Sequence, residues 1–315
     1  MGTGSPVIRV IRAGAPSSYG SDMGTVVWGE RPQREVLAAV LRNASYEVLP
    51  FRSTEEAVLA HVPRNVALTV TTTEAKGIER TLDLAERLTR HGYDTAPHLA
   101  ARLVRDDAHL ADVVARLRDA GVRSVFVIAG DAAEPAGPFP DALALLERLD
   151  AIGHPFRSVG IGGYPEGHGR IDDALIEKAL ELKAPHATQV ITQLCFDGAT
   201  TARWARAVQA RGVQLPIRVG IPGPVSRQKL VRISAGLGLG QSARFLRKQQ
   251  SMFWRFFLPG GYSPNRLLRQ LTPGFAGSGT TLRGVHVFTF NEVEKTEAWR
   301  RDQLARLSSA EREAS

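Results

Sequence analysis

Eight short apolar runs constrain the fold of this 315-residue chain more than any other feature. Most are rich in Val, Ile and Phe without strict alternation, and most precede an amphipathic stretch of helical length. Strands that alternate with helices predict parallel βαβ units, and eight such units predict an α/β fold, a closed (β/α)8 TIM barrel that forms a single domain. The runs span residues 45–51, 65–71, 94–99, 124–130, 156–164, 188–196, 216–223 and 285–291.

The remaining segments predict the helices and the limits of the barrel. Residues 1–30 are expected to form a flexible N-terminal extension and residues 302–315 a fraying tail, so the barrel would span 31–301. Residues 31–43 form an amphipathic pattern that predicts a plug at the barrel bottom. Turn residues within 251–282 predict a lid or insertion around a short helix. Other predicted helices span residues 54–61, 77–91, 106–120, 140–152, 172–184, 198–211 and 226–250.

Composition limits the classes of protein and ligand. No window approaches the ~20 apolar residues that cross a bilayer, and the N-terminal segment lacks the apolar core of a secretion signal. The single cysteine, Cys195, has no partner for an internal disulfide, which is typical of a reducing compartment. We therefore expect a cytoplasmic protein in which Cys195 is a packed strand residue rather than a nucleophile. No set of histidines and carboxylates has metal-ligand spacing, so we expect no metal.

Positive charge is concentrated in one part of the chain. The net charge is +8, yet the stretch between Asp197 and Glu292 contains 12 Arg and 2 Lys and no acidic residue. Such a block can attract an anionic ligand through its field, or it can consist of solvated helix faces. Nucleic-acid binding is not expected, because no recognised nucleic-acid module accompanies the block.

Polar residues end the apolar runs, at the face of a (β/α)8 barrel where chemistry takes place. These strand-end residues are Glu47, Thr71, His98, Asp131, Tyr164, Gln193 and Asn291. They predict a polar ring on an apolar barrel, and therefore a candidate active site at this end.

Short motifs at these strand ends occur in the order found in one family of barrel enzymes. They are Ser45-Tyr46-Glu47 with Pro50, Leu68 to Thr71, Pro97-His98-Leu99, Ala129-Gly130-Asp131, Tyr164-Pro165-Glu166 with His168, Thr192-Gln193 with Phe196-Asp197, Gly220-Ile221, and His286 with Thr289 and Asn291. With these motifs the chain resembles the methylenetetrahydrofolate reductase family over nearly the whole barrel. The resemblance implies an oxidoreductase of one-carbon metabolism that converts 5,10-methylenetetrahydrofolate to 5-methyltetrahydrofolate with NADH or NADPH.

The resemblance also implies roles for the strand-end residues. Glu47 is the candidate general acid that protonates N10 of the folate and opens its ring to an iminium at N5. A carboxyl group does this best when burial raises its pKa toward neutrality. Asp131 and Gln193 would hold the pterin, whose edge both donates and accepts hydrogen bonds. The flavin or nicotinamide region would contain Thr71, His98, Gly130, Tyr164 and His168.

The chain departs from the family motifs on the flavin side. Ala129 replaces the arginine of the family's R-G-D, and the helix after Tyr164 lacks the family's Asn, Arg and Lys pattern, so Lys178 or Lys183 would have to compensate. Either FAD binds and relays the hydride, or the nicotinamide delivers it directly to the iminium carbon.

The positive block and the reaction each allow more than one interpretation. The positive block predicts that arginines between Arg218 and Arg269 hold the folate glutamate tail or the nucleotide phosphates. A folate-binding barrel without reductase activity and a folate-dependent methyl-transfer enzyme remain as alternatives, because a fold does not determine a reaction.

Overall fold

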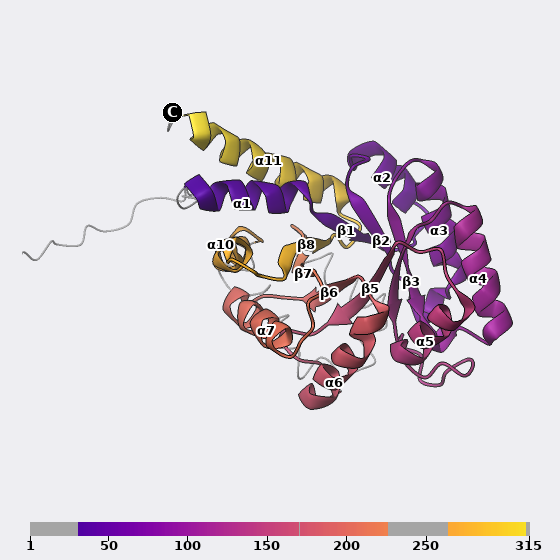
Figure 1. Ribbon diagram of the computed structural model, residues 1–315. Coiled ribbons are helices and arrows are strands. Elements are labelled where there is room, and N and C mark those ends of the chain that lie inside the picture. Colours follow the sequence, from indigo (N-terminus) through magenta and orange to yellow (C-terminus); the bar gives the residue numbers. More distant parts are fainter. Residues whose placement is uncertain (1–30, 170, 226–263, 313–315) are drawn as a thin grey trace, which may run out of the picture.

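Eight parallel strands form a closed barrel in the computed structural model, which describes residues 31–169, 171–225 and 264–312 (Figure 1). Each strand pairs with the next, and β8 closes the ring on β1. The (β/α)8 barrel expected from the apolar runs is therefore confirmed. The strands are β1 (Ser45–Val48), β2 (Ala67–Val70), β3 (Thr95–Ala100), β4 (Ser124–Ile128), β5 (Ser158–Gly163), β6 (Gln189–Leu194), β7 (Ile217–Pro222) and β8 (Leu282–Phe288).

Helices cover the outside of the barrel and complete its apolar core. Most of their bounds lie within two residues of the predicted ones. The α-helices are α1 (Arg31–Arg42), α2 (Thr54–His61), α3 (Glu79–Arg90), α4 (Asp107–Asp119), α5 (Ala142–Ile152), α6 (Asp173–Lys183), α7 (Gly198–Ala210), α10 (Pro264–Ala276) and α11 (Val293–Arg312). Short 3-10 turns are η1 (Glu74–Lys76), η2 (Ala101–Leu103) and η3 (Ala184–His186). None of the described helices is long and apolar enough to cross a membrane.

Aspartates determine where several helices begin. The side chains of Asp106, Asp141, Asp172 and Asp197 accept backbone N–H groups in the first turns of α4, α5, α6 and α7. Each carboxylate satisfies a donor that has no partner within the helix, and it also complements the positive end of the helix dipole. These caps fix where the loops from the carboxyl ends of the strands enter the helices.

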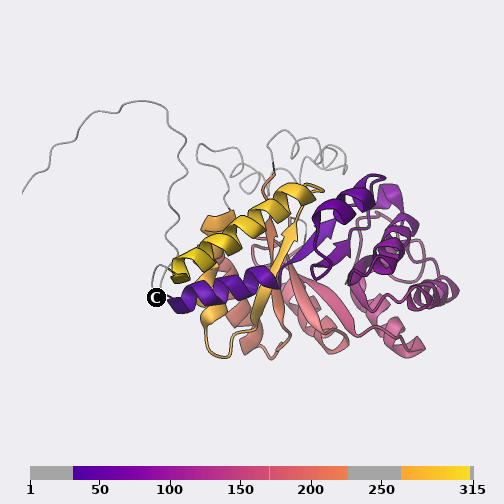
Figure 2. The ribbon, with the colours of Figure 1, turned by 90° about the horizontal axis from the view of Figure 1, so that it is seen from above.

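Helix α1 packs against α10 and α11 beside β8, as Figures 1 and 2 show. The prediction that it plugs the barrel bottom is therefore wrong. Its buried side chains, among them Leu37 and Leu41, form one apolar stripe that α10 and α11 cover.

Helix α10 occupies part of the predicted lid. It packs against α7 and α1 through buried side chains such as Leu267 and Leu271, so residues 264–276 belong to the outer layer of the barrel. Strand β8 then begins at Leu282 rather than at residue 285. Residues 251–263 of the predicted lid, the predicted helix 226–250 and the predicted extension 1–30 lie outside the described residues.

The C-terminal helix is packed over more of its length than expected. Helix α11 continues to Arg312, and Gln303 and Leu307 are buried within the segment predicted to fray. A hydrogen-bonded group anchors the helix to the barrel, because Tyr46 donates to Glu297 at 2.8 Å and Arg300 donates to the same carboxylate at 2.9 Å. All three side chains are buried, so the charges of Glu297 and Arg300 are compensated within the protein.

Candidate active site

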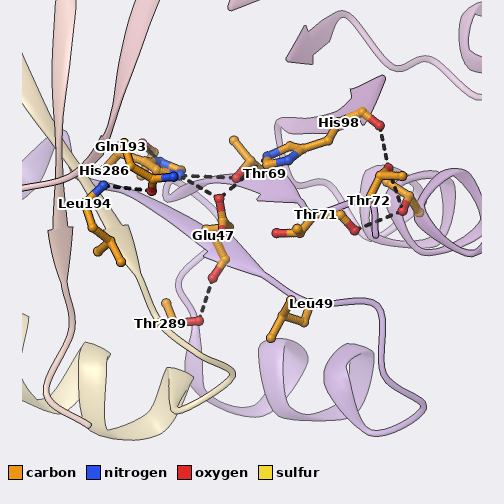
Figure 3. Close-up of polar contacts among 12 residues, drawn as sticks. Glu47, Leu49, Thr69, Thr71, Thr72, His98, Gln193, Leu194, His286 and Thr289 are labelled. Atoms are coloured by element: carbon orange, nitrogen blue, oxygen red, sulfur yellow. Dashed lines mark hydrogen bonds and ion pairs between the residues drawn. The ribbon is translucent and has the colours of Figure 1, made fainter. Parts of the chain in front are cut away.

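A mostly buried carboxylate lies between two histidines at the carboxyl-terminal end of the barrel (Figure 3). Oε2 of Glu47 in β1 lies 3.7 Å from Nε2 of His98 in β3 and 3.8 Å from Nε2 of His286 in β8. Successive side chains of a strand point to opposite faces, so Tyr46 meets α11 outside the barrel while Glu47 points inside. The closed barrel thus brings together three ionisable groups that are far apart in the sequence.

Two hydroxyl groups hold the ring of His286. Oγ of Ser45 lies 2.8 Å from its Nδ1, and Oγ1 of Thr69 lies 3.3 Å from its Nε2. With the ring 1% exposed, these contacts keep Nε2 directed toward Glu47. His286 was quoted in the family motifs but not predicted as a site residue, because its proximity to Glu47 depends on the closure of β8 onto β1.

The pKa of Glu47 differs from the expectation. Burial alone raises the pKa of this carboxyl, as predicted, but the imidazoles of His286 and His98 favour the carboxylate and lower the pKa below its usual value. The prediction that burial brings the group toward neutrality is therefore wrong for the ligand-free protein. At neutral pH Glu47 is a carboxylate here.

Two polar atoms beside Glu47 lack hydrogen-bond partners. Nε2 of His98 and Oγ1 of Thr71 are buried, and neither makes a hydrogen bond within the described part of the chain. Burial lowers the pKa of His98 to about 4, so the imidazole is neutral at pH 7 and can donate or accept one hydrogen bond there. Because unpaired buried polar groups cost free energy, the pair indicates the place of a polar ligand atom.

The predicted pterin contacts lie at the same end of the barrel and are exposed. Asp131 follows β4, and Gln193 lies in β6. Oε1 of Gln193 accepts the backbone N–H of Leu194 at 2.9 Å, while its Nε2 has no partner among the described residues. In the view of Figure 3, Gln193 and His98 lie on opposite sides of Glu47. A planar ligand over Glu47 could therefore meet an amide on one side.

Of the predicted cofactor residues, Thr71 and His98 lie beside Glu47, while Tyr164 and His168 form a second group after β5. The rings of Tyr164 and His168 meet edge to face with centroids 5.3 Å apart. Burial and the charge of Asp131 raise the pKa of Tyr164, so its hydroxyl stays protonated and Asp131 lies near it. Gly130 has a φ of +90°, and a Cβ there would approach Cβ of Ala100 to 3.1 Å. The turn that leads to Asp131 therefore requires glycine.

The residues described around α6 do not fit the phosphates of a flavin. Asp172 caps this helix and Asp173 lies in its first turn, so negative charge occupies the end that would attract a phosphate. Lys178 is 66% exposed and forms an ion pair within the helix. Lys183 ends the helix about 16 Å further along, away from the mouth. Neither lysine therefore lies at the amino-terminal end of α6.

The positive block is only partly described, and one of its described arginines lies at the opposite end of the barrel from the mouth. Arg218 lies near the amino-terminal end of β7, where its guanidinium donates to the carbonyl of Asn43 at 2.6 Å and to Gln189 at 3.3 Å. Arg218 therefore faces the opposite end of the barrel from the strand-end residues, and the predicted role of the other arginines of the block stays a prediction. Residues 226–263 of the block lie outside the described residues.

Comparisons with solved structures find similar chains at low identity. Oxaloacetate acetylhydrolase in complex with 3,3-difluorooxalacetate is 12% identical with a TM-score of 0.44, and the match covers 88% of this chain and 86% of that chain. A putative lyase/mutase from Burkholderia cenocepacia J2315 is 16% identical with a TM-score of 0.45 and the same coverage. 2,3-Dimethylmalate lyase is 13% identical with a TM-score of 0.40, covering 76% of this chain and 94% of that chain. Likenesses at this level carry no argument about activity.

The resemblance inferred from the motifs requires a correction. It identified a divergent methylenetetrahydrofolate reductase with altered flavin contacts over nearly the whole barrel. The family model described as methylenetetrahydrofolate reductase matches residues 43–238 and does not include the β8 motif with His286. The solved structures above are a hydrolase and lyase or mutase proteins, so they do not identify this chain as the reductase itself. Because the family model matches more than half of the 315 residues, the chain belongs to the methylenetetrahydrofolate reductase family.

Proposed function

We propose that this protein reduces 5,10-methylenetetrahydrofolate to 5-methyltetrahydrofolate with NADH or NADPH as the source of the hydride. In addition to the family membership, one observation at the site supports the proposal. The mostly buried carboxylate of Glu47 lies beside the unpaired Nε2 of His98 and the unpaired hydroxyl of Thr71. These three groups suit a ligand that presents a basic nitrogen at the barrel axis.

Glu47 would deliver the proton that opens the folate ring. The proton moves to N10, the bond between N10 and the methylene carbon breaks with its electron pair left on N10, and an iminium forms between that carbon and N5. A hydride from the nicotinamide then adds to the iminium carbon. When the pterin covers Glu47, the remaining 16% exposure of its side chain is lost. Desolvation then disfavours the carboxylate and moves the group toward its protonated form.

Asp131 and Gln193 would orient the pterin over Glu47. The carboxylate of Asp131 can accept hydrogen bonds from the amino-pyrimidine edge, and the amide of Gln193 can donate through its Nε2. Both side chains are exposed at the mouth before a ligand binds. Their task is positional, because hydride transfer needs the two carbons within about 3 to 3.5 Å.

For the hydride donor, we propose direct transfer from the nicotinamide nucleotide. Among the described residues, the start of α6 is acidic and no lysine lies near it, and both features argue against a bound FAD. The ring pair Tyr164 and His168 offers a surface at the mouth for a planar nicotinamide. His98 and Thr71 would contact whichever ring lies next to Glu47.

An absorbance spectrum followed by a turnover assay tests this function. The purified protein is expected to lack flavin bands near 450 nm and to oxidise NADH or NADPH on addition of 5,10-methylenetetrahydrofolate, with no increase when FAD is supplied. Activity that requires FAD would overturn direct transfer while it supports the reduction. Nucleotide oxidation that stays at the background level with either nucleotide, with and without FAD, would overturn the reductase proposal.

A folate-binding protein without reductase activity is the second candidate. The lowered pKa of Glu47 favours it, because a carboxylate that is ionised at neutral pH is a poor proton donor. Binding of 5-methyltetrahydrofolate, followed by the change in intrinsic fluorescence, without nucleotide oxidation would select this candidate.

A further inference from the structure

Strand β6 contains an extra residue between Ile191 and Leu194, in the stretch that holds Thr192 and Gln193. In the pairing with β7, Ile191 lies opposite Arg218 and Leu194 lies opposite Gly220. Three residue steps on β6 therefore oppose two steps on β7, which defines a β-bulge. Bulges direct a side chain away from the regular strand pattern and are common beside active sites. The bulge therefore determines where the Gln193 amide points.

Side chains replace the ladder hydrogen bonds that the bulge removes. The hydroxyl of Thr192 accepts the backbone N–H of Gly220 at 2.8 Å and donates to the carbonyl of Gln193 at 2.9 Å. The thiol of Cys195 donates to the same carbonyl at 3.2 Å. Thr192 is 1% exposed and Cys195 is 0% exposed, so water cannot substitute for either of them. The peptide of Gln193 is thus fixed from two directions.

Gly220 makes room for this arrangement on the neighbouring strand. A Cβ at that position would lie 2.4 Å from the carbonyl oxygen of Thr192 and 2.8 Å from that of Gln193. Both distances are far below van der Waals contact, and the atoms concerned belong to the backbone. The two carbonyls of the bulge can pack on β7 only because this residue is glycine.

Glu166 holds the chain that follows the bulge. Its Oε1 accepts the backbone N–H of Phe196 at 2.6 Å and that of Asp197 at 2.8 Å. Asp197 then caps α7. Hydrogen bonds to a charged acceptor are stronger than neutral ones. The loop after β5 therefore fastens the exit of β6, and the bulge is held at both of its ends.

We propose that Thr192 and Glu166 are positioning residues for Gln193, which they hold on the bulge so that its amide faces the pterin. The inference rests on the proposed function, because it takes Gln193 as a folate contact. A strand without the bulge would place the next side chain where Gln193 now lies, since a shift by one residue moves every side chain to the other face.

Thr192→Val tests the proposal, and Thr95→Val is its matched control. Valine keeps the shape of threonine and removes the hydroxyl. Thr95 is equally buried, at 1% exposure, but lies at the amino-terminal end of β3 and donates to the carbonyl of Ala85. Thr192→Val is expected to raise KM for methylenetetrahydrofolate by roughly 5- to 20-fold, from the loss of one or two hydrogen bonds, with KM for NADH unchanged. Thr95→Val is expected to leave both KM values unchanged.

A double-mutant cycle separates positioning from general destabilisation. If Thr192 acts through Gln193, then Thr192→Val combined with Gln193→Ala has the same folate KM as Gln193→Ala alone. An additive increase in KM would overturn the proposal. Glu166→Ala is expected to raise the folate KM, and Glu166→Gln to restore it, because an amide oxygen can also accept both N–H groups. Equal KM values in Glu166→Ala and wild type would overturn the role of Glu166.

Failure of this inference differs from failure of the proposed function. If wild type turns over and Thr192→Val has the folate KM of Thr95→Val, the positioning role is wrong and the reductase proposal stands. If wild type does not turn over but binds 5-methyltetrahydrofolate, the double-mutant cycle is repeated with the Kd for that ligand in place of KM. The expected ratios between the variants are the same. If wild type neither turns over nor binds this folate, both proposals are wrong.

Discussion

Acidification should accelerate the proposed reaction, because the structure places the pKa of Glu47 below its usual value of 4.5. A carboxyl group with a pKa of 4.5 is protonated in about one molecule in a thousand at pH 7.5 and in about one in ten at pH 5.5. A lower pKa reduces both fractions by the same factor. If the protonated form reacts, kcat/KM for the folate should rise about tenfold per pH unit, or about 100-fold over this range, without reaching a plateau.

Initial rates of NADH oxidation at low folate concentration measure this profile, since kcat/KM reports ionisations of the free enzyme. Glu47→Gln should lose the pH dependence and fall by roughly 10² to 10⁴ in kcat/KM. His286→Asn removes an imidazole that favours the carboxylate, so a plateau should appear at higher pH than in wild type. A wild-type plateau near pH 6.5 would show that burial prevails over the histidines and would refute the reasoning. A flat profile would remove Glu47 as the proton donor.

Three other properties can be checked by denaturation and chemical labelling. Burial lowers the pKa of His98 from 6.5 to about 4, so between these pH values the unfolded chain takes up a proton that the folded protein does not. The free energy of unfolding should therefore fall by up to about 3 kcal/mol as the pH drops through this window. The unfolding free energies of wild type and His98→Gln, measured by urea titration, should converge at low pH, and parallel curves would contradict the linkage. Arg300→Met leaves the carboxylate of Glu297 buried without its buried ion-pair partner and should cost about 3 to 5 kcal/mol of unfolding free energy. Arg301→Met, at 71% side-chain exposure, should cost less than about 1 kcal/mol. Burial raises the pKa of the Cys195 thiol to about 12, so a thiol reagent should label the protein only as it unfolds, and rapid labelling of the folded protein would contradict this burial.

The barrel itself could be predicted because its signals are local. Each strand is an apolar run and each helix an amphipathic stretch, and their alternation restricts the fold to a parallel sheet closed by helices. The predictions were wrong where an apolar face could pack against either of two parts of the protein. The stripe of α1 containing Leu37 and Leu41 could cover the barrel bottom or other helices, and only packing against α10 and α11 distinguishes the two. The short helix predicted within the lid is part of α10, and only its packing against α7 and α1 shows that it belongs to the outer layer.

The predicted site residues illustrate a different limit. Glu47, His98 and Gln193 lie at the mouth because strand ends in a parallel barrel meet at one face. Their environments could not be predicted, because each depends on neighbours from distant strands. His286 lies beside Glu47 through the closure of β8 onto β1. This contact changes the expected direction of the Glu47 pKa shift.

Local patterns along the chain were sufficient for the α/β class, the number of strands, most helix bounds and the ring of polar strand ends, because hydrophobic periodicity and caps act over a few residues. Strand pairing and side-chain packing determined the rest. They include the two histidines around Glu47, the unpaired Nε2 of His98, the bulge that carries Gln193 and the position of Arg218 at the opposite end of the barrel. These features depend on strand register and on burial by several elements at once, and they bring together residues that are far apart in the sequence.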